Sequence, residues 1–198
     1  ILLLLDEVIT AFGRLGSWSG ARHFGVKPDM IATAKAITNG YFPFGAVIIS
    51  DMVAEAFEND TTGAANIGSG YTYSGHPVGA AAAVACLKET VRLNVKDNAA
   101  ARGTQMWEGF KALKEKHDII GDIRGGVGLM TAMELIGDKA KKAPLDKARL
   151  EAIYEATYAA GTMIRVSGPN VIISPSLIIE EADVAKVLAD LDHGLSQA

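Results

Sequence analysis

The fold is decided by a stretch near the start of the chain, Leu2-Leu3-Leu4-Leu5-Asp6-Glu7-Val8. A continuous apolar run without alternation predicts a strand buried on both faces, the kind found in a parallel sheet. Asp6 would then lie at the carboxyl end of this strand, where open α/β sheets bind their ligands. A carboxylate beside such a core is costly unless a cation meets it, so we expect a cationic partner for Asp6.

The composition is that of an ordinary globular protein. The chain has 198 residues, of which 49% are hydrophobic and 21% charged, and this is enough for a large core. A net charge of −4 and the absence of a Lys/Arg cluster argue against a nucleic-acid binder. The single cysteine, Cys86, excludes an internal disulfide and a four-cysteine zinc site. No apolar run is long enough to span a membrane, and we expect a cytoplasmic protein.

The chain begins inside an apparent central strand. The first half offers only two further strand candidates, over residues 30–34 and 46–49. Because a complete sheet needs more strands, we expect the 198 residues to be the C-terminal portion of a longer protein. A targeting signal cannot be read from such a start.

Two regions of different character follow one another along the chain. Residues 1–94 mix strands and helices, which predicts an α/β domain with a mostly parallel sheet and flanking helices. Residues 95–198 combine amphipathic helices with short strands, which predicts a small α+β domain. Helices are expected over 20–24, 51–57, 77–91, 98–116, 146–160 and 184–191. A bent antiparallel hairpin or a kinked strand is expected over 120–135, and short strands over 163–166 and 171–173.

Three features of the first half suit one cofactor. They are Asp6 at a strand end, Lys35 at the end of an apolar segment, and the hydroxyl-rich turn from Tyr71 to Pro77 ahead of a helix. Pyridoxal phosphate needs an anion at its ring nitrogen, an amine for its aldehyde, and N–H and O–H donors for its phosphate. Taken singly, Lys35 also fits a surface lysine and the turn also fits a helix cap. The four histidines are scattered without the spacing of metal ligands.

Four ordered motifs extend this interpretation. They are Asp6-Glu-Val-Ile-Thr-Ala-Phe-Gly-Arg14, Lys27-Pro-Asp-Met-Ile-Ala-Thr-Ala-Lys35, Gly40-Tyr-Phe-Pro-Phe-Gly-Ala46 and Thr72-Tyr-Ser-Gly-His-Pro77. Together they resemble class III aminotransferases, which are fold-type I pyridoxal-phosphate enzymes, and the likeness is strongest to the ω-amino acid:pyruvate branch. The resemblance covers essentially the whole chain. It implies the C-terminal part of a large cofactor-binding domain over residues 1–94, followed by a small domain over residues 95–198.

The resemblance also implies roles for single residues in the first half. Asp6 would pair with the pyridinium nitrogen, Val8 would lie against the ring, and Lys35 would bond to the cofactor aldehyde and later act as the base. Thr72, helped by the backbone of Tyr71, would contact the cofactor phosphate from the neighbouring subunit. A homodimer with shared active sites would follow from this arrangement.

In the second half, Ile164-Arg165-Val166-Ser167-Gly168 resembles the segment that carries the substrate-carboxylate arginine of this branch. The planar guanidinium of Arg165 would bind a carboxylate through two hydrogen bonds. Other charged residues at family positions, Arg14, Arg124 and Glu134, are expected to form structural ion pairs. Glu7 should point to the opposite side of the strand from Asp6, so we do not expect it to be catalytic.

The resulting hypothesis is a ping-pong transaminase that moves an amino group from an amine or ω-amino acid to a keto acid, with pyruvate as the expected acceptor. Small-molecule amines and keto acids are the expected partners. Within the same family, an aminomutase or a dialkylglycine-type decarboxylase remains an alternative. Outside it, the apolar run with Asp6 and Glu7 also describes the Walker B strand of a P-loop ATPase, but the chain lacks the phosphate-binding motif.

Overall fold

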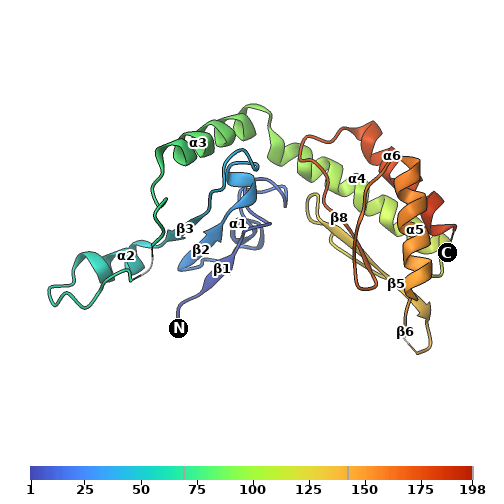
Figure 1. Ribbon diagram of the computed structural model, residues 1–198, viewed down its shortest axis with the longest axis horizontal. Coiled ribbons are helices and arrows are strands. Elements are labelled where there is room, and N and C mark those ends of the chain that lie inside the picture. Colours follow the sequence, from blue (N-terminus) through green and yellow to red (C-terminus); the bar gives the residue numbers. More distant parts are fainter. Residues whose placement is uncertain (69, 142, 198) are drawn as a thin grey trace. The chain divides into compact units, whose positions relative to one another are not determined.

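The computed structural model describes residues 1–68, 70–141 and 143–197. The chain divides into two compact units, Ile1–Lys96 and Asp97–Ala198. The elements of each unit can be followed by colour and label in Figure 1. Among the described residues, no helix is both long and apolar enough to cross a membrane.

The first unit contains a three-stranded sheet. Its strands are β1 (Leu4–Asp6), β2 (Met30–Thr33) and β3 (Ala46–Ile49), in the order β1-β2-β3. Strand β1 runs parallel to β2, and β3 runs antiparallel to β2. The predicted strands are therefore present, although β1 ends at Asp6 and is shorter than the apolar pattern suggested.

The leucine run is not buried on both faces, so this prediction is wrong for the chain as described. Leu2, Leu3 and Leu4 are 54%, 42% and 50% exposed. The reason is the place of β1 in the sheet, where it pairs with β2 on one side and with no other described strand. The same holds for β3, whose Val47 and Ile48 are 60% and 53% exposed.

Among its described residues, the first unit also contains four helical segments. They are α1 (Gly20–Phe24), the short 3₁₀ helix η1 (Lys35–Ile37), α2 (Asp51–Glu58) and α3 (Pro77–Arg92). Helix α3 packs against η1. The packing depends on Gly79, because a Cβ there would lie 2.7 Å from the ring of Phe44 and 2.9 Å from that of Phe42. A glycine in the first turn of α3 thus lets the helix rest on the aromatic loop that follows η1.

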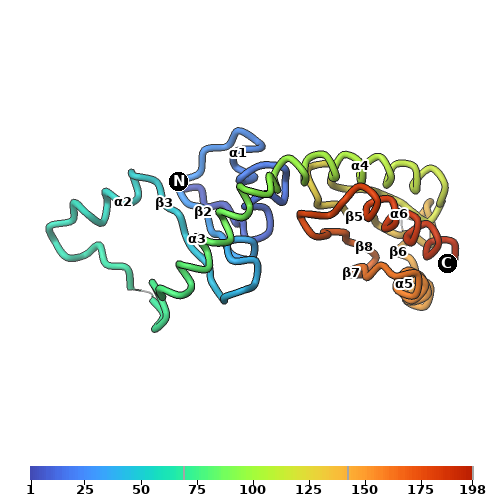
Figure 2. The backbone as a smooth tube through the Cα atoms, turned by 90° about the horizontal axis from the view of Figure 1, so that it is seen from above, coloured from blue at the N-terminus to red at the C-terminus, as the bar shows by residue number. Residues whose placement is uncertain are grey.

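The second unit is an antiparallel sheet covered by helices, as expected for an α+β domain. Its helices are α4 (Val95–Lys116), α5 (Lys147–Ala160) and α6 (Glu181–Leu195). Its strands are β4 (Ile120–Arg124), β5 (Thr131–Asp138), β6 (Ala143–Pro144), β7 (Arg165–Ser167) and β8 (Asn170–Ile173). The sheet order is β4-β5-β8-β7, and β6 pairs with β5. Figure 2 shows α5 almost end-on while α4 runs along the unit.

One hydrophobic core lies between this sheet and its helices. Met106 and Phe110 of α4 are fully buried, as are Met133 of β5, Val171 of β8 and Leu191 of α6. The alternation along β5 places every second side chain in this core, as the period of a strand requires. The predicted bend between β4 and β5 is confirmed and contains left-handed glycines at Gly125 and Gly126, with φ of 131° and 79°.

Candidate active site

Asp6 and Lys35 come together because their strands are parallel neighbours. Asp6 ends β1 opposite Ala32 of β2, and the N–H of Glu7 donates to the Ala32 carbonyl at 2.9 Å. Lys35 follows β2 directly and begins η1. The carboxyl ends of parallel neighbours lie at the same edge of a sheet, where α/β proteins bind ligands. An acid and an amine therefore share this edge.

Lys35 has a strained backbone. Its φ is 45°, in the left-handed region, where a residue with a Cβ is disfavoured by about 1–2 kcal/mol. The strain is held by hydrogen bonds, because the Lys35 carbonyl accepts from the N–H of Asn39 at 2.8 Å and of Thr38 at 3.3 Å. The turn directs the chain away from the line of β2 and leaves Lys35 exposed at the sheet edge. Strained backbone of this kind clusters at functional sites.

Asp6 is exposed and its carboxylate is oriented by the main chain. Its Oδ1 accepts a hydrogen bond from the N–H of Val8 at 3.0 Å, and Val8 itself is half-buried. A carboxylate anchored through one oxygen keeps acceptor capacity for a ligand. Of the predicted cofactor residues, Asp6, Val8 and Lys35 thus lie at or just beyond the same edge of the sheet.

Tyr71 and Thr72 lie in an exposed turn ahead of α3. The N–H of Tyr71 donates to Ser74 Oγ at 3.1 Å, and the N–H of Ser74 donates back to the Tyr71 carbonyl at 2.9 Å. His76 then caps α3 by accepting from the N–H of Val78 at 3.2 Å. Hydroxyl groups and a helix start are therefore adjacent here, as the sequence indicated. The contact of Thr72 with a phosphate stays a prediction.

Arg165 lies in the second unit, on the polar face of its sheet. Cross-strand pairing puts Arg124, Ala132, Ile172 and Arg165 in one row, and directly paired residues share a face. Both arginines of this row are exposed. The two arginines differ in their ion-pair and hydrogen-bond partners.

Arg124 is held by three neighbours, which confirms the predicted ion pair. Its Nη2 donates to Glu134 Oε2 and to Asn170 Oδ1, both at 2.8 Å, and its Nε lies 3.4 Å from Asp122 Oδ2. Arg165 forms no ion pair with any residue that the structure describes. The binding of a substrate carboxylate by Arg165 stays a prediction.

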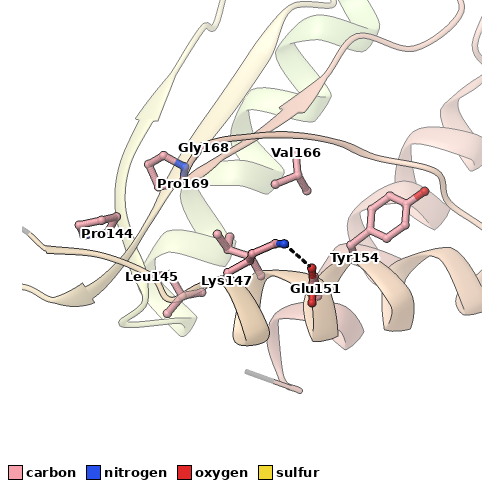
Figure 3. A pocket seen from close by; sticks show the side chains of 9 residues that line it. Pro144, Leu145, Lys147, Glu151, Tyr154, Val166, Gly168 and Pro169 are labelled. Carbon is pink, nitrogen blue, oxygen red and sulfur yellow. Dashed lines mark ion pairs between the residues drawn. The ribbon is translucent and has the colours of Figure 1, made fainter.

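The second unit also contains an apolar pocket of about 550 Å³. Its lining includes Leu145, Leu150, Tyr154 and Val166. Figure 3 shows the ion pair between Lys147 and Glu151, one turn apart on α5, whose Nζ and Oε1 lie 3.4 Å apart. Because side chains alternate along a strand, Val166 and its neighbour Arg165 face opposite sides of β7. The pocket therefore contains none of the predicted site residues.

Glu7 is the residue whose importance the sequence did not reveal. It is 2% exposed, and its carboxylate binds the first turn of α1. The sequence shows the two adjacent acids at the strand end. Gly20 and Ala21, the partners of Glu7, lie beyond a loop, and no sequence pattern links them to Glu7. The sequence predicted only that Glu7 points away from Asp6.

A carboxylate and an exposed lysine with a left-handed backbone thus lie at the carboxyl edge of parallel neighbouring strands, as the resemblance implied. Residues 1–195 match the family Aminotransferase class-III. The chain belongs to the class III aminotransferase family, and its α/β part and α+β part are of the predicted fold-type I architecture. A P-loop ATPase is thereby excluded.

Relatives and solved structures agree with this membership. The chain is 35% identical over 204 residues to taurine–pyruvate aminotransferase of Bilophila wadsworthia, covering 99% of this chain and 44% of the relative. It is 42% identical over 146 residues, 74% of this chain and 31% of the relative, to diaminobutyrate–2-oxoglutarate transaminase of Halomonas elongata. An amine transaminase from an uncultivated Pseudomonas species, solved in its pyridoxal-phosphate-bound form, superposes with a TM-score of 0.94 at 38% identity, covering 99% of this chain and 44% of the other. The chain thus spans less than half the length of these proteins.

Proposed function

We propose that this protein is a pyridoxal-phosphate-dependent aminotransferase that moves an amino group from an amine or ω-amino acid to a keto acid. The observation that carries the proposal is the pair at the sheet edge, where the strained Lys35 and the exposed Asp6 end parallel neighbouring strands. Membership of the class III family supports the same reaction.

The residues at this edge fit the cofactor by their chemistry. Asp6 supplies an anion, already anchored through Oδ1, for a protonated ring nitrogen, and Lys35 supplies an exposed amine for an aldehyde. When bound, pyridoxal phosphate provides an electron sink that stabilises negative charge at the substrate carbon next to nitrogen. Val8 contacts one ring face in this proposal, and its backbone N–H already donates to the Asp6 carboxylate.

Lys35 carries out the proton transfer in this proposal. Its amine would hold the cofactor by its aldehyde before substrate arrives. Once freed by the substrate amine, it would take the proton from the substrate carbon, carry it as an ammonium, and deliver it to the carbon on the cofactor side of the nitrogen. Asp6 keeps the ring nitrogen protonated, which lowers the cost of charge developing at that carbon. Tyr71 and Thr72 hold the phosphate in the neighbouring subunit, so two chains complete each site.

Arg165 binds the carboxylate of the keto acid in this proposal. A guanidinium without an ion-pair partner among the described residues can form two parallel hydrogen bonds to a carboxylate. Pyruvate is the acceptor that the name of the Bilophila relative supports, and 2-oxoglutarate is the one that the Halomonas relative supports. Arg165 suits the carboxylate next to the ketone in either acceptor, so the choice between them is an experimental one.

The test uses the full-length enzyme, candidate amines and the two keto acids. We expect a visible absorbance band with pyridoxal phosphate, its loss on addition of a productive amine, and its return with pyruvate. Return only with 2-oxoglutarate would change the acceptor, release of carbon dioxide would indicate a decarboxylase, and turnover without any keto acid would indicate an aminomutase.

Replacing Lys35 tests the residue assignment directly. Lys35→Ala should abolish both the band and amino transfer, with a loss of at least about a thousandfold. Lys27→Ala, at an exposed lysine ahead of β2, is the matched control and should keep both. Full activity in Lys35→Ala would disprove the assignment.

A further inference from the structure

Glu7 is a buried carboxylate directly beside Asp6, and all of its hydrogen bonds are made within the first unit. Its Oε2 accepts from the N–H of Gly20 at 2.7 Å and from Thr10 Oγ1 at 2.5 Å, while its Oε1 accepts from the N–H of Ala21 at 2.7 Å. Burial would raise the pKa of Glu7, but these three hydrogen bonds outweigh it and lower the pKa below its usual range. The carboxylate therefore remains an anion at neutral pH.

Gly20 is shaped to receive this carboxylate. A Cβ at that position would lie 3.2 Å and 3.3 Å from the two oxygens of Glu7, closer than side chains normally approach. The first residue of α1 is thus small at the one point where Glu7 needs access to two backbone N–H groups. Glu7, Thr10 and Gly20 consequently tie the end of β1 to the start of α1 across the intervening loop.

The tie fixes the backbone that orients Asp6. Glu7 is held at three points, because its N–H donates to Ala32 at 2.9 Å, its carbonyl accepts from Ala11 at 3.1 Å, and its side chain is bound as described. Val8, the next residue, donates the N–H that holds Asp6 Oδ1 at 3.0 Å. A rotation of the peptide between Glu7 and Val8 would turn this N–H away from Asp6.

We propose that Glu7 is a positioning residue, which aims the Asp6 carboxylate at the cofactor ring nitrogen by locking the Val8 N–H. The proposal rests on the function proposed above. Glu7 would act through Asp6, without contact with cofactor or substrate. The lock would work equally in the apoenzyme, because every contact in it is made by this chain.

The test compares Glu7→Gln with Glu55→Gln in the full-length holoenzyme. Glu55→Gln removes the same charge from an exposed site on α2. In Glu7→Gln an amide NH₂ replaces an oxygen that faces backbone donors, so we expect roughly tenfold weaker cofactor binding. We also expect the nitrogen NMR signal of the labelled cofactor ring to move toward that of an unprotonated ring at fixed pH. A residue that only stabilised the fold would lower the melting temperature without moving this signal.

Thr10→Val is the second variant, and it removes a single hydrogen bond from Glu7. If Glu7→Gln does not fold, Thr10→Val tests the proposal through cofactor affinity and the ring nitrogen signal. We expect both to change in the same direction as for Glu7→Gln, but by less. Ring signal and cofactor affinity equal to those of Glu55→Gln in the variant that folds would overturn the role of Glu7.

Hydrogen exchange on the apoenzyme separates this proposal from the function on which it rests. Faster exchange at the amides of Val8, Gly20 and Ala21 in Glu7→Gln is expected whether or not the cofactor binds. Unchanged exchange there would overturn the lock itself. A wild-type enzyme that binds no pyridoxal phosphate would overturn the proposed function, even if the lock were intact.

Discussion

The two units of the chain treat their apolar side chains differently. In the second unit, Met106, Phe110 and Leu191 are fully buried in one core between sheet and helices. In the first unit, the apolar strands β1 and β3 remain largely exposed, as Leu4 and Val47 illustrate at 50% and 60%. The unit with the exposed strands carries the acid and the lysine of the candidate site. The well-packed unit carries Arg165.

The largest expected effect tests whether chemistry in the first unit can be removed without loss of structure. Asp6→Asn should lower amino transfer by about a thousandfold, because a neutral amide no longer stabilises a protonated ring nitrogen. Asp6 is exposed, so the melting temperature of the apoenzyme should move by less than about 2 °C. Steady-state kinetics and calorimetry measure the two quantities. Activity close to that of the wild type would remove Asp6 from the site.

The second prediction concerns the core of the other unit. Phe110→Ala should reduce the free energy of unfolding by about 3–5 kcal/mol, because the ring is fully buried and leaves a cavity. Tyr158→Ala is the control, since that ring is 56% exposed. Denaturant unfolding of the full-length enzyme measures both. A cost for Phe110→Ala no larger than for Tyr158→Ala would show that the core is not what stabilises this unit.

The third prediction concerns Arg165, the one predicted site residue in the well-packed unit. Arg165→Ala should raise the KM of the keto acid by about 10- to 100-fold, since hydrogen bonds to a charged group are lost. The KM of an amine without a carboxylate should stay within about threefold. Equal changes for both substrates would indicate a general disturbance of the site instead of a lost carboxylate contact.

The smallest effect is electrostatic and lies in the second unit. Lys116 and His117 donate to Asp192 at 2.6 Å and 2.7 Å, and the hydrogen bonds lower the pKa of this carboxyl. A lowered pKa in the folded state stabilises the protein above the pKa of the unfolded carboxyl, and this contribution is lost as pH falls through the folded value.

Asp192→Asn should therefore cost about 0.5–1 kcal/mol at neutral pH, a modest value because the carboxyl is partly exposed and screened. The cost should vanish in acid, once the wild-type carboxyl is protonated. Unfolding free energies of wild type and variant, measured as a function of pH, test this. A difference that stays constant down to the acid limit would contradict the ionic origin of the effect.

The helices and most strands could be predicted because their signals are local. The helix predicted over 77–91 is observed at Pro77–Arg92, and the bent hairpin appears as β4 and β5 around Gly125 and Gly126. The burial of the leucine run could not be judged, because exposure depends on which strands lie beside β1. Strand β6 was missed as well, since its Ala143–Pro144 has no apolar pattern and forms only through pairing with β5.

At the candidate site, residue identity was predictable and conformation was not. The motifs pointed to Asp6 and Lys35, and strand order explains why they share one edge. Nothing in Ala34-Lys35-Ala36 indicates a left-handed residue, because this conformation is imposed by bonds from Thr38 and Asn39. The contacts of Glu7 likewise join positions separated by a loop, and such long-range contacts cannot be predicted from a single sequence.

The left-handed backbone at Lys35 has a consequence for engineering. Glycine adopts a φ of 45° without a Cβ penalty. Lys35→Gly should therefore raise the free energy of unfolding of the apoenzyme by up to about 1 kcal/mol, while it removes the proposed amine. A library selected for thermal stability alone would therefore favour the loss of the enzyme's chemistry at this position. Directed evolution of this protein needs a screen that demands turnover in every round.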